Sequence, residues 1–179
     1  MFKIAFAATA VLAAVAAPAF AQTAPAPATA STSTIERTYP SPTAFIASTV
    51  TVPAGAELIF LSGQLPDVAD TTAPAGTVAA YGDTETQAAS TFAKIERLLA
   101  TRGLTMGDVV SMTVYLMAAP GSERMDFAGM MKAYGKYFGT PEQPNRPSRS
   151  TVQVAGLAGP GFLIEVEVTA ARTPAAPAH

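Results

Sequence analysis

The chain has 179 residues, a formal net charge of −2, no cysteine and one histidine, His179, at its end. With 49% hydrophobic residues it can bury the core of one domain. Disulfides and thiolate catalysis are excluded, and so is catalysis by a histidine on the Ala/Pro-rich end, where we expect no fixed geometry. Lysine and arginine form no cluster, so the sequence gives no sign of a nucleic-acid partner.

The first 21 residues have the three parts of a secretory signal peptide. Lys3 supplies the positive charge, residues 4–17 the apolar run, and Ala19-Phe20-Ala21 the small-x-small cleavage site. A membrane anchor or a buried helix is the alternative, but a membrane span needs about 20 apolar residues. We therefore expect cleavage, export to the periplasm and no stable membrane insertion of the mature protein.

Three further segments follow this leader. Residues 22–33 are rich in Ala, Pro and Thr and are predicted to be a linker, 34–172 to be the folded domain, and 173–179 to be a flexible tail.

The first half of the domain predicts two strands and a helix. Residues 45–52 and 57–62 are rich in β-branched and apolar residues and are separated by the turn sequence Pro53-Ala54-Gly55, which indicates a hairpin. Residues 67–82 are expected to be a loop. The apolar spacing then predicts a helix over 84–102, capped by Asp83 or by Thr84 with Gln87 in a capping box.

The second half predicts a strand, a helix and two more strands. Residues 109–117 alternate between apolar and polar, 124–138 have helical spacing, and 149–155 and 162–171 alternate again. The resulting order, β-β-α-β-α-β-β, predicts an α+β fold in which one mixed sheet is covered by two helices.

Arg149 and Glu165 are the first candidates for chemistry. Side chains alternate along a strand, so if the last two strands pair across the turn at 159–161, the faces that carry Arg149 and Glu165 coincide. A guanidinium matches a carboxylate ligand, and a glutamate can activate water. The alternative is a cross-strand ion pair on a solvated face, which contributes less than about 1 kcal/mol.

Two other positions have both a functional and a structural interpretation. Ser62 and Gly63 end a strand, where a hydroxyl and free backbone groups can line a site or form an ordinary turn. Ser62 has no histidine partner, which excludes a serine-hydrolase triad. Tyr115 lies on the polar side of its strand and can point into a site or cover the edge of the core.

Taken in order, these segments resemble the RidA (YjgF/YER057c) family of enamine/imine deaminases over about residues 45–171. The resemblance is carried by Leu61-Ser62-Gly63-Gln64-Leu65-Pro66, Thr113-Val114-Tyr115-Leu116, Pro147-Ser148-Arg149-Ser150-Thr151-Val152 and Ile164-Glu165-Val166-Glu167. Departures from the family pattern are Met131 in place of an asparagine, Thr151 where cysteine is common, and no clear match in 45–49 for a first-strand tyrosine.

The resemblance implies a chorismate-mutase-like fold and a homotrimer with sites in clefts between subunits. It implies that Arg149 binds a substrate carboxylate and that Glu165 places the attacking water. It also implies that Ser62, Gly63 and Thr151 line the pocket, with Tyr115 a weaker candidate. No metal or other cofactor is expected.

Two functions follow as expectations. The first is an exported hydrolase similar to 2-iminobutanoate/2-iminopropanoate deaminase, which converts reactive 2-imino or enamine acids to 2-oxo acids and ammonia in the cell envelope. The alternative is a non-catalytic trimer that binds small carboxylates or proteins in the same clefts.

Overall fold

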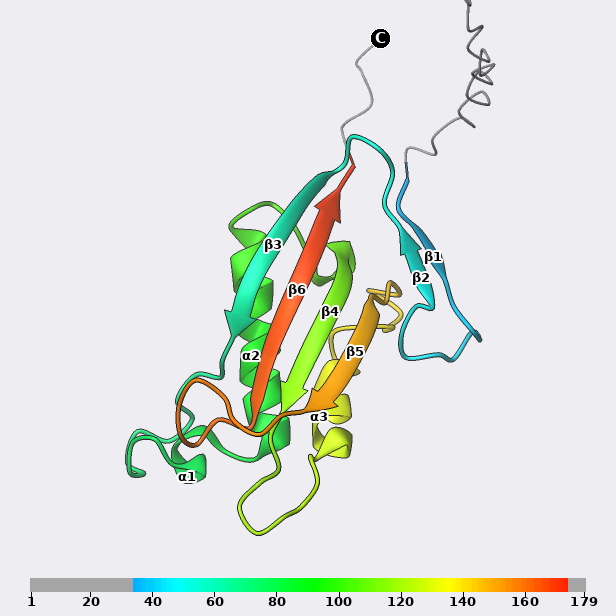
Figure 1. Ribbon diagram of the computed structural model, residues 1–179. Helices are drawn as coiled ribbons and strands as arrows, with labels where there is room; N and C mark the ends of the chain where they lie inside the picture. The colour runs from blue at the N-terminus through cyan, green and yellow to red at the C-terminus, as the bar shows by residue number, and fades with distance from the viewer. Residues whose placement is uncertain (1–33, 174–179) are drawn as a thin grey trace, which may run out of the picture. The chain divides into compact units, whose positions relative to one another are not determined.

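The computed structural model describes residues 34–173 (Figure 1). The signal peptide and linker predicted for 1–33, and all but the first residue of the predicted tail, lie outside the described residues. The elements, in chain order, are β1 (Glu36–Thr38), β2 (Thr49–Thr51), β3 (Glu57–Gln64), α1 (Val78–Tyr81), α2 (Thr84–Ala100), the 3₁₀ turn η1 (Met106–Asp108), β4 (Val109–Leu116), α3 (Phe127–Tyr134), β5 (Ser148–Gln153) and β6 (Ile164–Arg172).

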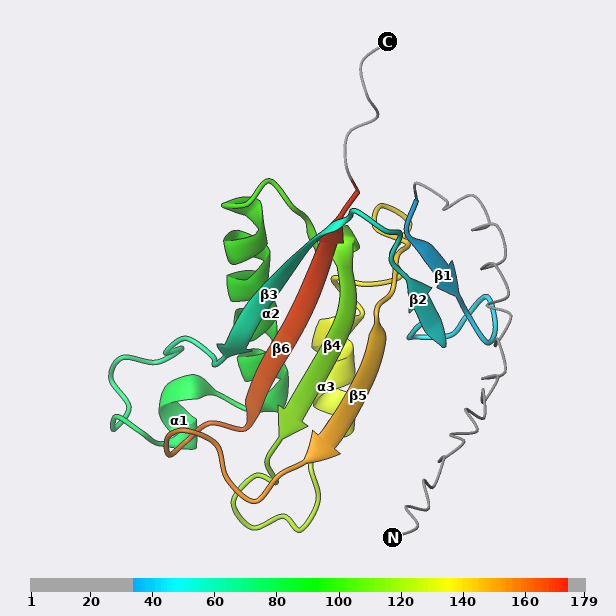
Figure 2. The same cartoon turned by 45° about the horizontal axis from the view of Figure 1, so that its top comes forward.

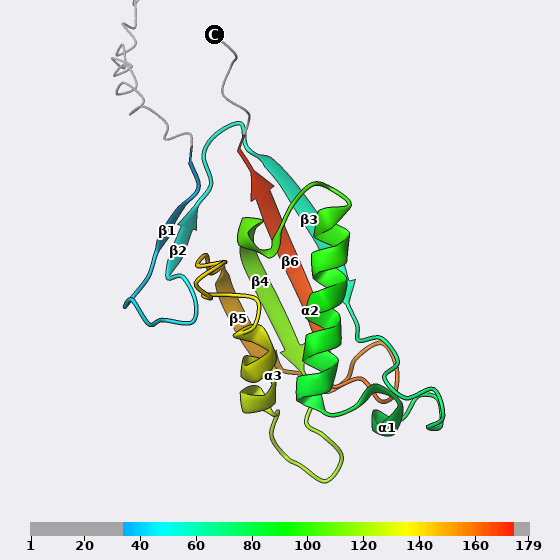
Figure 3. The ribbon, with the colours of Figure 1, turned by 180° about the vertical axis from the view of Figure 1, so that it is seen from behind.

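Four strands form a mixed sheet in the order β3-β6-β4-β5. The β4–β5 pair is parallel, and the other two pairs are antiparallel. Helices α2 and α3 cover one face of this sheet, as Figure 3 shows from behind. No helix of residues 34–173 covers the opposite face, which is turned toward the viewer in Figure 1 and is called the open face below. The predicted α+β arrangement of one mixed sheet and two covering helices is confirmed.

The core lies between the helices and the sheet. Asp83 caps α2 by accepting a hydrogen bond from the backbone N–H of Thr86 (2.9 Å). One stripe of the helix, which includes Phe92, Ile95 and Leu99, is fully buried. The alternation predicted for β4 is present, because Met112, Val114 and Leu116 are buried and face the helices.

The hairpin predicted between 45–52 and 57–62 is wrong. β2 contains only Thr49–Thr51 and pairs with β1, a strand that the sequence analysis missed, while β3 pairs with β6. The turn at 53–55 therefore carries the chain from a small ribbon into the sheet (Figure 2). Alternation indicates that a segment is extended, but it does not identify the partner strand.

The hairpin predicted between the last two strands is also wrong. β4 lies between β5 and β6, and the loop over 154–163 crosses from one to the other. The backbone N–H of Val154 donates to the carbonyl of Leu116 (2.9 Å), and that of Met117 donates to Leu163 (2.9 Å). These bonds hold both ends of the loop against the end of β4.

The helices differ from their predicted bounds in places. Asp126 accepts a hydrogen bond from Gly129 (2.8 Å), so α3 begins later than predicted, and it ends at Tyr134 instead of 138. A short helix, α1, occupies part of the predicted loop. Over residues 34–173, no helix has both the length and the apolar character needed to cross a bilayer.

The capping box predicted from Thr84 and Gln87 is not formed. Gln87 is fully buried, and its side-chain amide donates to the carbonyls of Gly82 and Gly161 (both 2.9 Å) and accepts from the N–H of Leu163 (2.8 Å). Gln87 therefore fixes the loop that leads into β6.

Candidate functional site

Arg149 lies on the helix-covered side of the edge strand β5. It is registered with buried Met112 of β4, and registered neighbours point to the same face of a sheet. Its guanidinium carbon lies 4.3 Å from the ring centroid of Tyr134 and 5.8 Å from that of Phe127, both on α3. Its Nη2 lies 3.3 Å from the sulfur of Met131. Two rings and a thioether thus fix the cation.

The electrostatics keep Arg149 charged and its neighbour neutral. Burial lowers the pKa of Arg149, and Tyr134 opposes this shift; a guanidinium is so weak an acid that the group remains a cation at neutral pH. Burial also raises the pKa of the Tyr134 phenol to about 12, although the nearby arginines lower it. The phenol of Tyr134 is therefore uncharged at neutral pH and does not neutralise the guanidinium.

Two buried polar atoms at this place lack hydrogen-bonding partners. Within residues 34–173, Nη1 of Arg149 and Oγ1 of Thr151 are both without one. The two residues are two positions apart on the same face of β5. Buried polar groups are normally paired, so this pair can receive a ligand that accepts hydrogen bonds.

Glu165 lies on the open face and meets the backbone of Gly63. The β3–β6 register shifts between Leu61 and Gln64, which is the mark of a β-bulge. A side chain at Gly63 would occupy the space that the carboxyl group of Glu165 fills. The bulge and the missing side chain therefore allow the carboxylate to lie directly against the strand end that the sequence analysis singled out.

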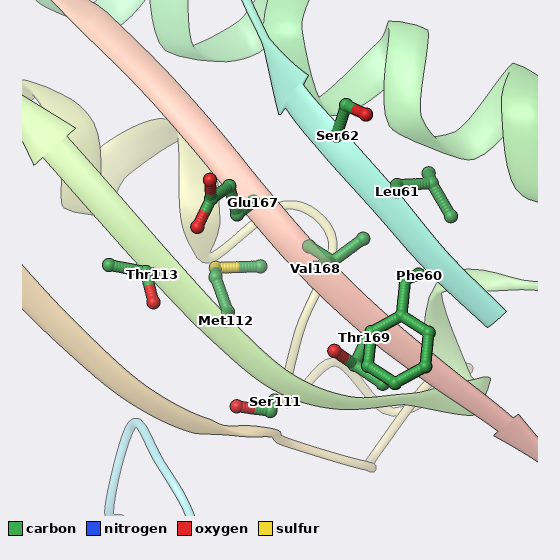
Figure 4. Close-up of a pocket in the computed structure, with 9 residues that line it drawn as sticks. All are labelled: Phe60, Leu61, Ser62, Ser111, Met112, Thr113, Glu167, Val168 and Thr169. Carbon is green, nitrogen blue, oxygen red and sulfur yellow. The ribbon is translucent and has the colours of Figure 1, made fainter. Parts of the chain in front are cut away.

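Tyr115 and Ser62 lie on the same open face, on either side of Glu167. The hydroxyl of Tyr115 donates to Glu167 (3.0 Å), and this bond is the main cause that raises the Tyr115 pKa. Ser62 and Glu167 line a hollow of about 310 Å³, and Figure 4 shows both side chains there. Tyr115, Glu165 and Glu167 line a neighbouring hollow of about 270 Å³.

The predicted site residues therefore form two groups in one chain. Arg149 and Thr151 lie on the helix side of β5, whereas Ser62, Gly63, Tyr115 and Glu165 belong to the open-face region of β3, β4 and β6. The prediction that Arg149 and Glu165 share a face is wrong. On β4, Met112 is the partner of Arg149 and Tyr115 is the partner of Glu165, and these two β4 residues differ by an odd number of positions. Adjacent strand positions of opposite parity point to opposite faces.

The surroundings of Arg149 contain three residues of α3 that were not among the predicted site residues. Phe127, Met131 and Tyr134 follow one another on α3 at spacings of four and three, which places them on one helix face. That spacing was visible in the sequence. What it could not show is that this stripe contacts β5 as well as the buried core.

These features define an α+β domain of chorismate-mutase-like fold with a half-buried arginine, one nitrogen of which is unpaired, at the edge of its sheet. The sequence matches the family described as Endoribonuclease L-PSP over residues 43–172, and the chain belongs to this family, which includes the RidA, YjgF and RutC proteins.

Relatives match most of the domain. TdcF of Escherichia coli K12, whose name classes it with reactive intermediate deaminases, is 31% identical over 116 residues, 65% of this chain and 80% of TdcF. A RutC family protein of Pyrococcus horikoshii is 32% identical over 112 residues, 63% of this chain and 77% of that protein. The crystal structure of E. coli TdcF with bound serine superposes with a TM-score of 0.51 at 30% identity, covering 68% of this chain and 84% of TdcF.

Proposed function

We propose that the protein hydrolyses reactive 2-imino acids and their enamine tautomers to 2-oxo acids and ammonia. Water adds to the imine carbon, the carbon–nitrogen bond breaks, and the nitrogen leaves as ammonia while the oxygen of water remains as the new carbonyl. The observation that carries this proposal is the half-buried Arg149 cation with a buried, unpaired Nη1, in a chain similar to TdcF, which is named as a reactive intermediate deaminase.

Each site residue has a role in this scheme. Arg149 binds the substrate carboxylate, and Thr151 offers its hydroxyl beside it. Glu165 holds the attacking water, accepts its proton and passes that proton to the nitrogen, which leaves as ammonia. Ser62 and the backbone of Gly63 line the pocket next to Glu165, and Tyr115 lies at its border. Binding and orientation of the imine, together with acid–base catalysis, are enough for this reaction, and the scheme needs no cofactor.

The two groups come together between chains in this proposal. Arg149 of one subunit and Glu165 of the next would face each other in a cleft of a homotrimer. The open face offers surface for such contact, because Phe60 is 74% exposed and Leu58 and Val152 are also large exposed apolar residues. Large apolar side chains exposed on one face of a sheet favour a protein interface.

A small substrate fits the chain better than RNA does, although the family description names an endoribonuclease. The net charge is −2, and lysine and arginine are scattered along the sequence, so the electrostatic attraction that RNA binding requires has no visible source. Export to the periplasm is part of the proposal and is supported only by the leader-like sequence of residues 1–21.

One observation favours a second candidate, a trimer that binds small carboxylates without turnover. In a single chain the carboxylate-binding group and the water-placing group lie on opposite faces of the sheet, so binding at Arg149 does not by itself require catalysis. Binding with no turnover in the assay below would select this candidate.

A coupled assay tests the proposal. An amino-acid oxidase supplies 2-imino acids, and the purified mature protein is expected to speed the appearance of 2-oxo acid above the spontaneous rate. Arg149→Ala should remove most of the acceleration. No acceleration with any of several imines would contradict the proposed function.

A further inference from the structure

We propose that Met131 is a site of reversible oxidation by peroxides, and that its sulfoxide oxygen binds the Arg149 guanidinium in place of a substrate carboxylate. The proposal rests on the proposed role of Arg149 as the carboxylate anchor. It adds a chemical modification of one residue and, through it, a redox control of substrate binding.

The sulfur of Met131 lies against the guanidinium of Arg149, 3.3 Å from its Nη2. A thioether is only a weak hydrogen-bond acceptor, so this contact satisfies the nitrogen poorly. The neighbouring Nη1 has no partner within residues 34–173. The cation therefore remains available to a stronger acceptor that is placed at the sulfur.

Met131 is accessible, in contrast to the methionines of the core. It is half-buried on α3, next in sequence to the fully buried Met130. Hydrogen peroxide is a small polar molecule and can reach a sulfur that is partly open to solvent. Three methionines are at most 4% exposed, namely Met106, Met112 and Met130. We therefore expect Met131 to react before these three.

The oxidation is balanced with hydrogen peroxide as the oxidant. A lone pair of the sulfur forms the new S–O bond while the O–O bond breaks, and the second oxygen keeps both hydrogens and leaves as water. The sulfur is oxidised by two electrons and the peroxide is reduced by two. The N–H groups of Arg149 lie beside the sulfur and can stabilise the negative charge that develops on the leaving oxygen.

The sulfoxide changes what the guanidinium of Arg149 contacts. Its polar oxygen is attached to the atom that already lies 3.3 Å from Nη2, and the rotatable bonds of Met131 can direct it at the cation. A hydrogen bond between the two would satisfy the arginine within its own chain, and a substrate carboxylate would then have to displace it. We expect oxidation to weaken carboxylate binding at least about tenfold.

Peroxide treatment followed by calorimetry tests this inference. The full mature chain is treated with hydrogen peroxide, peptide mass spectrometry measures oxidation at each methionine, and the Kd for 2-oxobutanoate is determined. The Kd should rise at least about tenfold as Met131 is oxidised, and methionine sulfoxide reductases for both sulfoxide epimers should restore it. Full oxidation of Met131 with an unchanged Kd would overturn the proposal, and so would a Met131 that resists peroxide as the core methionines do.

Variants assign the effect to one sulfur. Met131→Leu removes the sulfur, and peroxide should then leave the Kd of this variant at its own untreated value. Met117→Leu and Met125→Leu change the two other half-buried methionines of residues 34–173 and should keep the wild-type response to peroxide. An equal rise in Kd for Met131→Leu and the wild type after peroxide would contradict the assignment.

Met131→Gln separates blockage of the arginine from damage to the fold. Its amide supplies a permanent oxygen acceptor, so it should bind 2-oxobutanoate at least about fivefold more weakly than Met131→Leu without any peroxide. Equal Kd values for the two variants would overturn the proposal. Circular dichroism monitors the folded fraction, and a loss of affinity that only follows a loss of folded protein would overturn it as well.

The same samples distinguish failure of this inference from failure of the deaminase proposal. Imine turnover that persists unchanged after full oxidation of Met131 would overturn the redox control and leave the deaminase function intact. Peroxide-sensitive binding without turnover in the untreated protein would contradict the deaminase function and support the redox control. No binding of 2-oxobutanoate to the untreated protein would remove the anchor role of Arg149, and with it this inference.

Discussion

The carboxyl group of Glu165 fills the space in which a side chain on Gly63 would lie. The two residues come from different strands, and the β-bulge in β3 brings them together on the open face. The space that Glu165 occupies therefore favours glycine at this position. Backbone conformation does not require it, because the φ of Gly63 is not positive.

Gly63→Ala should reduce imine turnover by about 100-fold or more, because the added methyl group displaces the carboxylate of Glu165, which we propose places the water. The displaced group is a side chain that can move, so the free energy of unfolding should fall by only about 1 kcal/mol. Gly135→Ala is the matched control, since a methyl group there makes only an ordinary contact, 3.5 Å from the carbonyl oxygen of Met131. Steady-state kinetics and urea unfolding of both variants check the prediction, and unchanged turnover in Gly63→Ala would contradict it.

Arg149→Ala should weaken binding of a 2-oxo acid by about 10- to 100-fold, the usual effect of removing a charged hydrogen-bond donor. Arg149→Lys should recover part of this affinity, because an ammonium supplies the charge without the guanidinium fork. Arg97→Ala removes an arginine that is exposed on α2 and should leave binding unchanged. Calorimetry measures all three, and equal losses in Arg97→Ala and Arg149→Ala would show a general charge effect instead of a site.

Gln87→Leu should lower the free energy of unfolding by about 2–4 kcal/mol. The change leaves the Leu163 N–H and the carbonyls of Gly82 and Gly161 without their side-chain partner in the interior. Glu96→Leu, on an exposed position of the same helix, should change it by less than about 0.5 kcal/mol. Urea denaturation compares the two, and similar midpoints would show that the Gln87 network is not needed for stability.

The stability of the fold should fall at alkaline pH through Tyr134. Burial raises the pKa of the folded phenol to about 12, above the ordinary value of 10.0. The unfolded chain therefore loses its proton first, and the stabilisation present below pH 10 is lost as the pH rises toward 12. We expect this group to account for about 2 kcal/mol over that interval.

Tyr134→Phe isolates this contribution. The variant keeps the ring under Arg149 but removes the ionisable group and its hydrogen bond to the carbonyl of Phe45 (2.9 Å). It should be less stable than the wild type at pH 8 by about 1 kcal/mol and should lose less stability between pH 10 and 12. Parallel alkaline slopes for the two proteins in urea unfolding would contradict the assignment.

Much of the fold could be predicted from local patterns in the sequence. The alternation along β4 and the apolar stripe of α2 each arise from contacts within one element and its core face, so they are visible in a short window. The short strand Glu36–Thr38 was missed because three residues give too little alternation to detect.

The pairing of strands could not be predicted in the same way. Arg149 and Glu165 each lie on a recognisable strand, but their relation depends on β4, which is inserted between them. The face on which each residue lies is set by its register with β4, which local alternation does not give. The candidate residues were therefore identifiable, whereas their separation within one chain required the structure.

The central claim, that Arg149 and Glu165 act together in deamination from two different subunits, is tested most directly by mixing two inactive variants. Arg149→Ala and Glu165→Gln are unfolded, combined in equal amounts and refolded together, and imine turnover is measured by the coupled assay. Each interface of a cyclic trimer draws the two residues from two subunits, so about one quarter of the interfaces should contain both native residues. We predict about a quarter of the wild-type activity in the mixture and almost none in either variant alone. A mixture as inactive as its components, beside an active wild type, would contradict a site shared between subunits.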